Sequence, residues 1–91
     1  MKIKLSRLAA QDLQSAFDYI SKENINAANS VIKRILESIE KLTNFPAMGR
    51  AGRVPHTKEL VVSGSPFIIV YQVHQNTMYI VRIIHASKKW P

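Results

Sequence analysis

The spacing of the apolar residues changes once along this chain, at Pro46, and this change limits the folds that are open to it. Before Pro46, apolar residues recur every three or four positions in two stretches, residues 7–22 and 27–45, as on one face of an amphipathic helix. After it, residues 57–62, 67–73 and 78–84 are rich in β-branched and aromatic residues and are separated by the turn sequences SGSP and HQNT. The pattern predicts a helical half followed by a β half.

Local signals give the expected ends and order of these elements. Ser6 and Asn26 each precede a helical stretch and can cap it, because their side-chain oxygens can accept hydrogen bonds from the free N–H groups of the first turn. The break between the two stretches is short, which favours an antiparallel hairpin of helices. Residues 2–5 alternate polar and apolar, which predicts a short strand that joins the sheet. The expected fold class is α+β, with β-α-α-β-β-β order and the two-helix hairpin packed on a twisted antiparallel sheet.

The lengths of the two turns predict a register for the last three strands. Ile69 is expected to lie opposite Arg82, and Tyr71 opposite Ile80. Lys58, Tyr71 and Arg82 would then share one face of the sheet. The other face is expected to carry five residues: Glu59, Val70, Val81, Ile83 and His85.

Length and composition exclude several classes of protein. The 91 residues, 46% of them hydrophobic, suffice for one core, so we expect a single domain spanning residues 1–91. The chain has no cysteine, which excludes disulfide scaffolds, thiolate zinc sites and catalytic cysteines. The three histidines lack the close spacing of metal ligands, and neither a metal nor a cofactor is expected. The absence of a signal-peptide pattern and of an apolar run of ~20 residues predicts a cytoplasmic protein without a membrane partner.

The net charge of +7 is concentrated in the second half of the chain, where residues 50–91 contain six basic residues and one acidic residue. This concentration suggests a polyanionic target such as nucleic acid, an acidic protein surface or an acidic peptide, although a solvated basic surface is the simpler alternative. Arg50 and Arg53 lie in a Gly- and Pro-rich loop, and their planar guanidinium groups suit carboxylates and phosphates. Two solvated loop charges are an equally acceptable interpretation.

Three residues near the end of the chain are candidates for chemistry or contact. Arg82 interrupts the apolar run IVRII, and an unpaired buried guanidinium would cost several kcal/mol, so we expect it to pair with a carboxylate or to face a wet groove. His85 can act as an acid or base near neutral pH, or simply cap a backbone carbonyl. Trp90 is expected to fold back on the sheet, with a contact role as the alternative. No motif of a known catalytic site is present, and no catalytic residue is expected.

These residues belong to an ordered series of short motifs that covers nearly the whole chain. The series is A-x-x-D-L at residues 9–13, Y-I at 19–20, P-x-M-G-R-x-G-R-V-P at 46–55, T-K-E-L-V-V at 57–62, F-I-I-V-Y at 67–71 and H-A-S-K-K-W-P at 85–91. Taken together it resembles the ParE branch of the RelE/ParE superfamily of bacterial type II toxins. The resemblance implies a growth-inhibiting toxin that acts on DNA gyrase and is neutralised by the flexible C-terminal segment of a cognate antitoxin.

We expect the antitoxin and the target to be bound mainly by basic and aromatic residues, and operator DNA to be reached only through the antitoxin complex. The candidates are Arg50, Arg53, Lys58, Tyr71, Arg82, Lys88, Lys89 and Trp90.

Two alternatives remain open from the sequence. In the RelE branch, toxins cut messenger RNA on the ribosome and usually carry an arginine where Ile68 stands here, which disfavours that activity. If RNA cleavage holds, His85 would be the acid or base, with Arg82 and Lys88 as cations on the phosphate. The other alternative is a degenerate binding module that only pairs with its antitoxin, and harmless expression would identify it.

Overall fold

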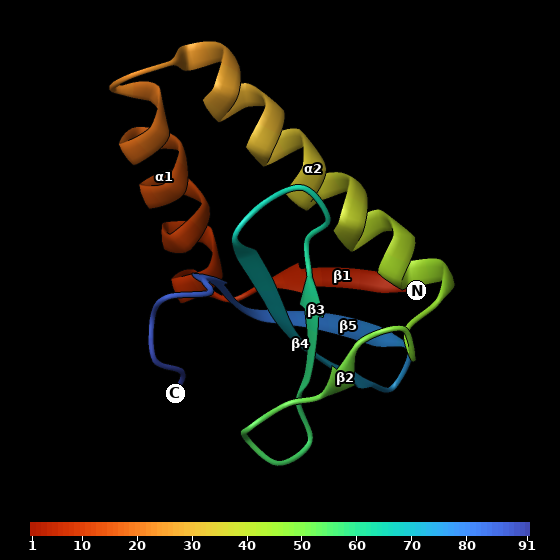
Figure 1. Cartoon of the computed structure of the whole chain (residues 1–91). Coiled ribbons are helices and arrows are strands. Elements are labelled where there is room, and N and C mark those ends of the chain that lie inside the picture. The colour runs from red at the N-terminus through yellow and green to blue at the C-terminus, as the bar shows by residue number, and fades with distance from the viewer.

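Two helices and five strands follow one another along the chain, and the structure, a computed structural model, describes all residues from 1 to 91 (Figure 1). Their order is β1 (Lys2–Leu5), α1 (Arg7–Ser21), α2 (Ile25–Asn44), β2 (Arg50–Ala51), β3 (Lys58–Val61), β4 (Phe67–His74) and β5 (Thr77–His85). The predicted hairpin of helices on a sheet is confirmed. Neither helix combines the length and the apolar composition that crossing a membrane requires.

Each helix begins at a side chain that accepts a hydrogen bond from its first turn. Ser6 caps α1 as predicted, with its Oγ 2.9 Å from the backbone nitrogen of Ala9. The cap of α2 is Asn24 and not Asn26, because the Oδ1 of Asn24 lies 3.0 Å from the backbone nitrogen of Ala27. Both asparagines precede the apolar stripe of α2, so propensity alone does not distinguish them.

The five strands form one mixed sheet in the order β1-β5-β4-β3-β2. Strand β1 pairs with β5 in parallel, whereas all other neighbours are antiparallel, so the expectation of an antiparallel sheet throughout was wrong for β1. The alternation of residues 2–5 indicates a strand but carries no information on its neighbour or its direction. The two-residue strand β2 was not expected, because it lies within a loop sequence that shows no strand pattern.

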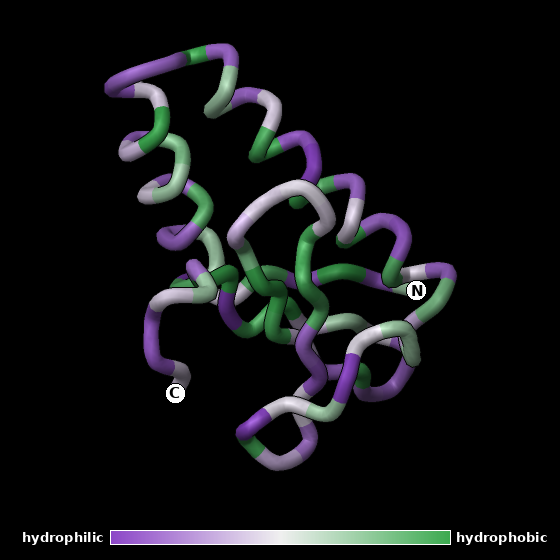
Figure 2. Tube along the Cα trace, in the orientation of Figure 1, coloured by the Kyte–Doolittle hydropathy of each residue, from purple (hydrophilic) through white to green (hydrophobic).

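The hydrophobic core lies between the helices and one face of the sheet. Figure 2 shows hydrophobic residues recurring along both helices and gathering in the central strands, while the tip of the hairpin is largely hydrophilic. The core cluster contains twelve buried residues: Ala9, Ala16, Ile35, Ile39, Leu42, Val62, Phe67, Ile69, Tyr71, Met78, Ile80 and Ile83. We call the side of the sheet whose side chains belong to this cluster the helix face, and the opposite side the open face.

A β-bulge in β5 changes the predicted register. Tyr71 pairs with Ile80 as expected, but Val70 pairs with Arg82, so Val81 is an extra residue in β5. Ile69 therefore lies opposite Ile83 and not opposite Arg82.

The bulge also exchanges the faces of the residues that follow it. Arg82 lies on the open face in the same row as Glu59 and Val70, whereas Ile83 and His85 pair with residues of the helix face. The prediction that Arg82 shares a face with Lys58 and Tyr71 was wrong for this reason, although Lys58 does pair with Tyr71.

Candidate functional site

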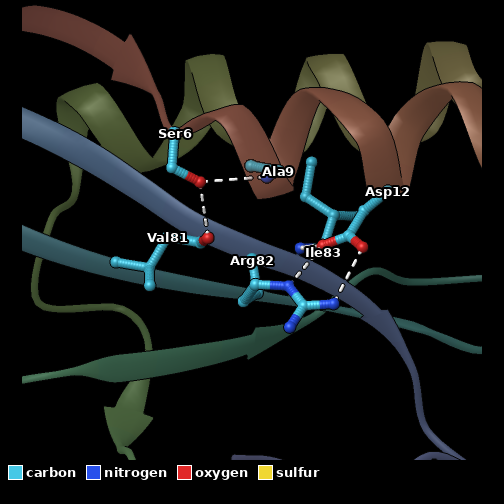
Figure 3. Close-up of polar contacts among 6 residues, drawn as sticks. All are labelled: Ser6, Ala9, Asp12, Val81, Arg82 and Ile83. Carbon is cyan, nitrogen blue, oxygen red and sulfur yellow. Dashed lines mark hydrogen bonds and ion pairs between the residues drawn. The ribbon is translucent and has the colours of Figure 1, made fainter.

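Beyond the end of β1, side chains at the start of helix α1 form the hydrogen bonds along the edge of β5. Strand β1 pairs with β5 only as far as Ile80, and beyond it the backbone of β5 meets side chains of α1 (Figure 3). The Ser6 hydroxyl donates to the carbonyl oxygen of Val81 at 2.7 Å, and the Ile83 N–H donates to Oδ2 of Asp12 at 2.9 Å. Two edge groups of the sheet thus obtain partners from the first turns of a helix.

Asp12 also holds the guanidinium group of Arg82 at two points (Figure 3). The distances are 2.8 Å from Nε to Oδ2 and 3.0 Å from Nη2 to Oδ1. The hydrogen bond to Asp12 is the main cause that raises the pKa of Arg82, against a smaller opposing effect of burial. The expectation that Arg82 pairs with a carboxylate is confirmed, and its charge is balanced inside the molecule.

Asp12, the partner of Arg82, was not among the residues expected to take part in the site. It lies 70 residues before Arg82 and outside the apolar stripe of α1, so its own surroundings in the chain resemble those of a solvated helix residue. The only signal was indirect, because a guanidinium inside an apolar strand requires a carboxylate somewhere in the fold.

A groove of about 570 Å³ lies between α1 and the end of β5, and its lining includes Asp12, Tyr19, Arg82, His85 and Lys88. The structure thus brings together Arg82, His85 and Lys88, the three residues expected to act if the protein cleaves RNA. Arg82 is already neutralised by Asp12, however, and only Lys88 offers a cation without an ion pair.

His85 ends β5 and is held by its neighbours. Its Nδ1 accepts the backbone N–H of Ser87 at 3.1 Å and lies 2.7 Å from the Ser87 hydroxyl, so the ring accepts a backbone N–H instead of capping a carbonyl. A neutral imidazole that accepts at Nδ1 carries its hydrogen on Nε2. The ring also packs edge-on against Phe67, with 5.5 Å between the ring centroids. His85 can therefore donate a hydrogen bond from Nε2, but the lone pair that a general base needs is occupied.

The loop between α2 and β3 is fixed to the open face by Glu59. The carboxylate of Glu59 lies 3.5 Å from Nη2 of Arg50 and accepts the backbone N–H of Arg53 at 3.1 Å. Gly52 closes the loop by donating to the carbonyl of Thr57 at 2.8 Å. The side chain of Glu59 is 6% exposed, whereas that of Arg50 is 63% exposed. A buried carboxylate thus binds an arginine that solvent can reach.

The C-terminal tail folds back against the sheet and meets this loop. The guanidinium carbon of Arg82 lies 5.7 Å from the centre of the Trp90 ring, within the range of a cation–π contact. Nη1 of Arg53 donates to the backbone oxygen of Trp90 at 3.3 Å. Arg53, Arg82 and Trp90 are thus brought together, and the expectation that Trp90 folds back on the sheet is confirmed.

The other predicted contact residues lie apart from this cluster. Tyr71 is fully buried, and its hydroxyl donates to the Pro46 carbonyl at 2.7 Å and accepts the Gly49 N–H at 2.9 Å. Burial raises the pKa of Tyr71, and the hydrogen bond from Gly49 opposes this effect in part. Lys58 is half-buried beside Tyr71, and Lys89 is exposed in the tail. Tyr71 is thus a core residue that fixes the exit of α2 and has no surface for a partner.

Comparison with known proteins finds one matching family and two related toxins. The model of a family described as the ParE toxin of the type II toxin–antitoxin system parDE matches residues 3–90. A protein of Sinorhizobium fredii provisionally named toxin Y4kP is 34% identical over 90 residues, which covers 99% of this chain and 93% of that protein. Toxin RelE2 of Caulobacter vibrioides is 34% identical over 80 residues, which covers 88% of this chain and 89% of that protein.

A solved structure has the same fold. A chain from the chromosomal ParDE system of P. aeruginosa superposes with a TM-score of 0.84 at 27% sequence identity, covering 93% of this chain and 95% of that chain. The two helices and the five-stranded mixed sheet described above thus agree with this fold.

Proposed function

Because this chain belongs to the ParE family of toxins from type II toxin–antitoxin systems, we propose that it inhibits growth by poisoning DNA gyrase. The family implies an antitoxin as partner. In our proposal, the flexible C-terminal segment of the antitoxin orders on the toxin and holds it inactive. In the same proposal, operator DNA is recognised by its sequence only through this toxin–antitoxin complex.

The observation that carries the proposal is that Arg82 and His85, which line the groove beside α1, are already hydrogen-bonded within the protein. Cleavage of RNA needs a free base and cations that can approach a phosphate. Asp12 binds the guanidinium of Arg82 at two points, and Ser87 donates to Nδ1 of His85. The guanidinium of Arg82 and the Nδ1 lone pair of His85, two of the groups that such chemistry would use, are thus engaged within the protein, and only Lys88 stays unpaired. This supports a toxin that acts by binding.

We propose that the contact with gyrase is made by the tail and the loop that it meets. Arg53 and Trp90 join the two segments, and Lys88 and Lys89 are exposed between Trp90 and β5. Arg82 acts as a positioning residue in this arrangement, because it holds the Trp90 ring while its own charge is balanced by Asp12.

Supercoiling by purified gyrase tests this proposal. Wild-type toxin is expected to inhibit the reaction, and the double variant Lys88→Gln/Lys89→Gln is expected to inhibit it less. The variant Lys22→Gln/Lys33→Gln, which loses the same charge from exposed positions in the helical hairpin, is the matched control and is expected to behave as wild type. Full inhibition by the tail variant would exclude these lysines from the contact.

Truncation after His85 is a stronger test of the tail. It removes Trp90 and the hydrogen bond from the Ala86 N–H to the Pro66 carbonyl, so circular dichroism must first establish that the truncated chain folds. A folded truncation that still poisons gyrase would contradict the proposed role of the tail.

Ribosome-dependent RNA cleavage is the second candidate, favoured by the presence of Arg82, His85 and Lys88 in one groove. It predicts cut messenger RNA in the presence of ribosomes and loss of cutting in His85→Ala. Intact RNA at toxin concentrations that inhibit gyrase would exclude it.

Expression without antitoxin distinguishes both toxin activities from a degenerate binding module. We expect growth to stop and to resume when the cognate antitoxin is supplied. Normal growth during expression of the folded protein would favour the degenerate module.

A further inference from the structure

The charge of the molecule is divided unevenly between its two layers. The helical hairpin, residues 6–45, contains five basic and five acidic residues and has no net charge. The strands, their loops and the tail contain the remaining eight basic residues and a single acidic residue, so they carry the entire net charge of +7. The single acid is Glu59, which is buried and bound to Arg50. The positive field of the protein therefore comes from its sheet layer.

Part of the open face is not covered by the tail or by the loop between α2 and β3. Two rows of residues cross it, one formed by Lys4, Tyr79 and Gln72 and the other by Lys2, Thr77 and His74. We call these six residues the lysine patch. Lys2, Lys4 and His74 are exposed, Tyr79 and Gln72 are half-buried, Thr77 is buried, and the patch contains no acidic residue and no aliphatic side chain.

The chemistry of the lysine patch favours a phosphate backbone over an acidic protein. Its accessible lysine, glutamine and tyrosine side chains are of the kinds with which proteins contact phosphates and sugars. A stable protein interface instead needs apolar or large aromatic anchors in a well-packed centre, and Tyr79 is the only Phe, Tyr or Trp side chain here.

The same composition favours a duplex over a single strand. Proteins that bind single strands stack successive bases on several aromatic side chains. Trp90, the other aromatic residue of the open face, is already in contact with the Arg82 guanidinium. Lys2 and Lys4, two residues apart on the open face of β1, fit the outside of a duplex, where only the backbone is read.

We propose that the lysine patch binds the phosphate backbone of duplex DNA without reading its sequence, so that the toxin contacts both gyrase and the DNA that gyrase holds. The choice of DNA over RNA duplexes rests on the proposed function, since gyrase acts on DNA. Lys2 and Lys4 provide the two phosphate contacts, and Tyr79 and Gln72, which continue the row of Lys4 across the sheet, add hydrogen bonds beside them.

Fluorescence anisotropy with a short labelled DNA duplex of arbitrary sequence tests this inference on the toxin alone. Each lysine that neutralises a phosphate makes the slope of log K against log salt more negative by about 0.9. Lys2→Gln/Lys4→Gln is therefore expected to have a slope that is less negative by about 1.8. Between about 50 mM and about 200 mM salt, the wild type should lose about 12-fold more affinity than this variant.

Matched controls separate a specific patch from general charge. Lys22→Gln/Lys33→Gln has the same net charge as the patch variant and is expected to retain the wild-type slope. Equal losses in the two double variants would overturn the inference, and so would stronger binding to a poly-glutamate peptide or to an RNA duplex than to DNA. Because β1 is an edge strand, circular dichroism checks the fold of each variant. Lys4→Gln alone, with an expected slope change of about 0.9, replaces the double variant if that fails to fold.

The failure of this inference can be told from the failure of the proposed function. Toxin that inhibits gyrase but has no affinity for the duplex would refute the DNA contact and leave gyrase as the target. Toxin that binds the duplex through Lys2 and Lys4 but leaves supercoiling unchanged would refute the gyrase proposal and support the patch.

Discussion

Removal of the Asp12 carboxylate tests how α1 is joined to the sheet. Asp12 accepts three hydrogen bonds, two from the Arg82 guanidinium and one from the Ile83 N–H. Breaking a buried ion pair by removing one partner costs about 3–5 kcal/mol. The side chains of Asp12 and Arg82 are 16% and 27% exposed, so water recovers part of this loss. We expect Asp12→Ala to lower the free energy of unfolding by about 2–3 kcal/mol.

Chemical and thermal unfolding measure this effect. For a chain of this size, about 1 kcal/mol corresponds to roughly 4–8 °C in Tm, so Asp12→Ala is expected to melt about 8–24 °C below wild type. A double-mutant cycle with Arg82→Ala should give a coupling energy above about 1 kcal/mol. Asp18→Ala is the control, because Asp18 lies exposed on the same helix and is expected to change stability by less than about 0.5 kcal/mol. A loss in Asp12→Ala no larger than in Asp18→Ala, or additive effects in the cycle, would refute this reasoning.

Four further changes test other parts of the account. Tyr71→Phe leaves the Gly49 N–H and the Pro46 carbonyl without a partner and should cost about 1–3 kcal/mol at neutral pH. Burial raises the pKa of Tyr71 in the folded state, so above about pH 10 the tyrosine ionises first in the unfolded chain. Wild type therefore loses stability in that pH range, and the difference in free energy of unfolding between wild type and Tyr71→Phe should become smaller. A difference in urea unfolding that does not change across that range would contradict this assignment. Gly49→Ala would bring a new Cβ within 2.5 Å of the Tyr71 hydroxyl and should cost about 1–3 kcal/mol, whereas a wild-type midpoint would mean that the exit of α2 has room to adjust. Ser6→Ala removes the cap of α1 and the bond to β5, for an expected loss of about 1–2 kcal/mol by thermal melting, and Ser6→Asp, which restores only the cap, should recover part of it. Trp90→Phe should change stability by less than about 1 kcal/mol by thermal melting followed by circular dichroism, because the buried indole N–H has no partner to lose and a Phe ring can also face the Arg82 guanidinium. A larger loss would contradict this reasoning.

The main elements of the fold were predictable because they depend on local patterns. The cap at Ser6 and the strand residues around Tyr71 follow from side-chain chemistry and from apolar spacing, which act over a few residues. The direction of β1 depends on its pairing with β5, far along the chain, and β2 exists only through its pairing with β3; neither pattern encodes which strands pair.

The bulge at Val81 explains most of what the sequence could not predict about the site. The run IVRII alternates in no way that indicates an extra residue, and a shift of one position moves every later side chain to the other face. Arg82 thereby reaches the open face and Trp90, while Ile83 enters the core. That Arg82 needs a carboxylate was predictable, but the identity of that carboxylate depends on how α1 docks along β5.

The most direct test of the central claim is the formation of covalent gyrase–DNA cleavage complexes with purified toxin. Ribosome-dependent RNA cleavage is measured beside it on the same preparation. Our account predicts that toxin increases the amount of DNA cleaved by gyrase and leaves messenger RNA intact. Cut RNA with unaffected gyrase would contradict the account, and His85 and Arg82 would then be the first residues to substitute.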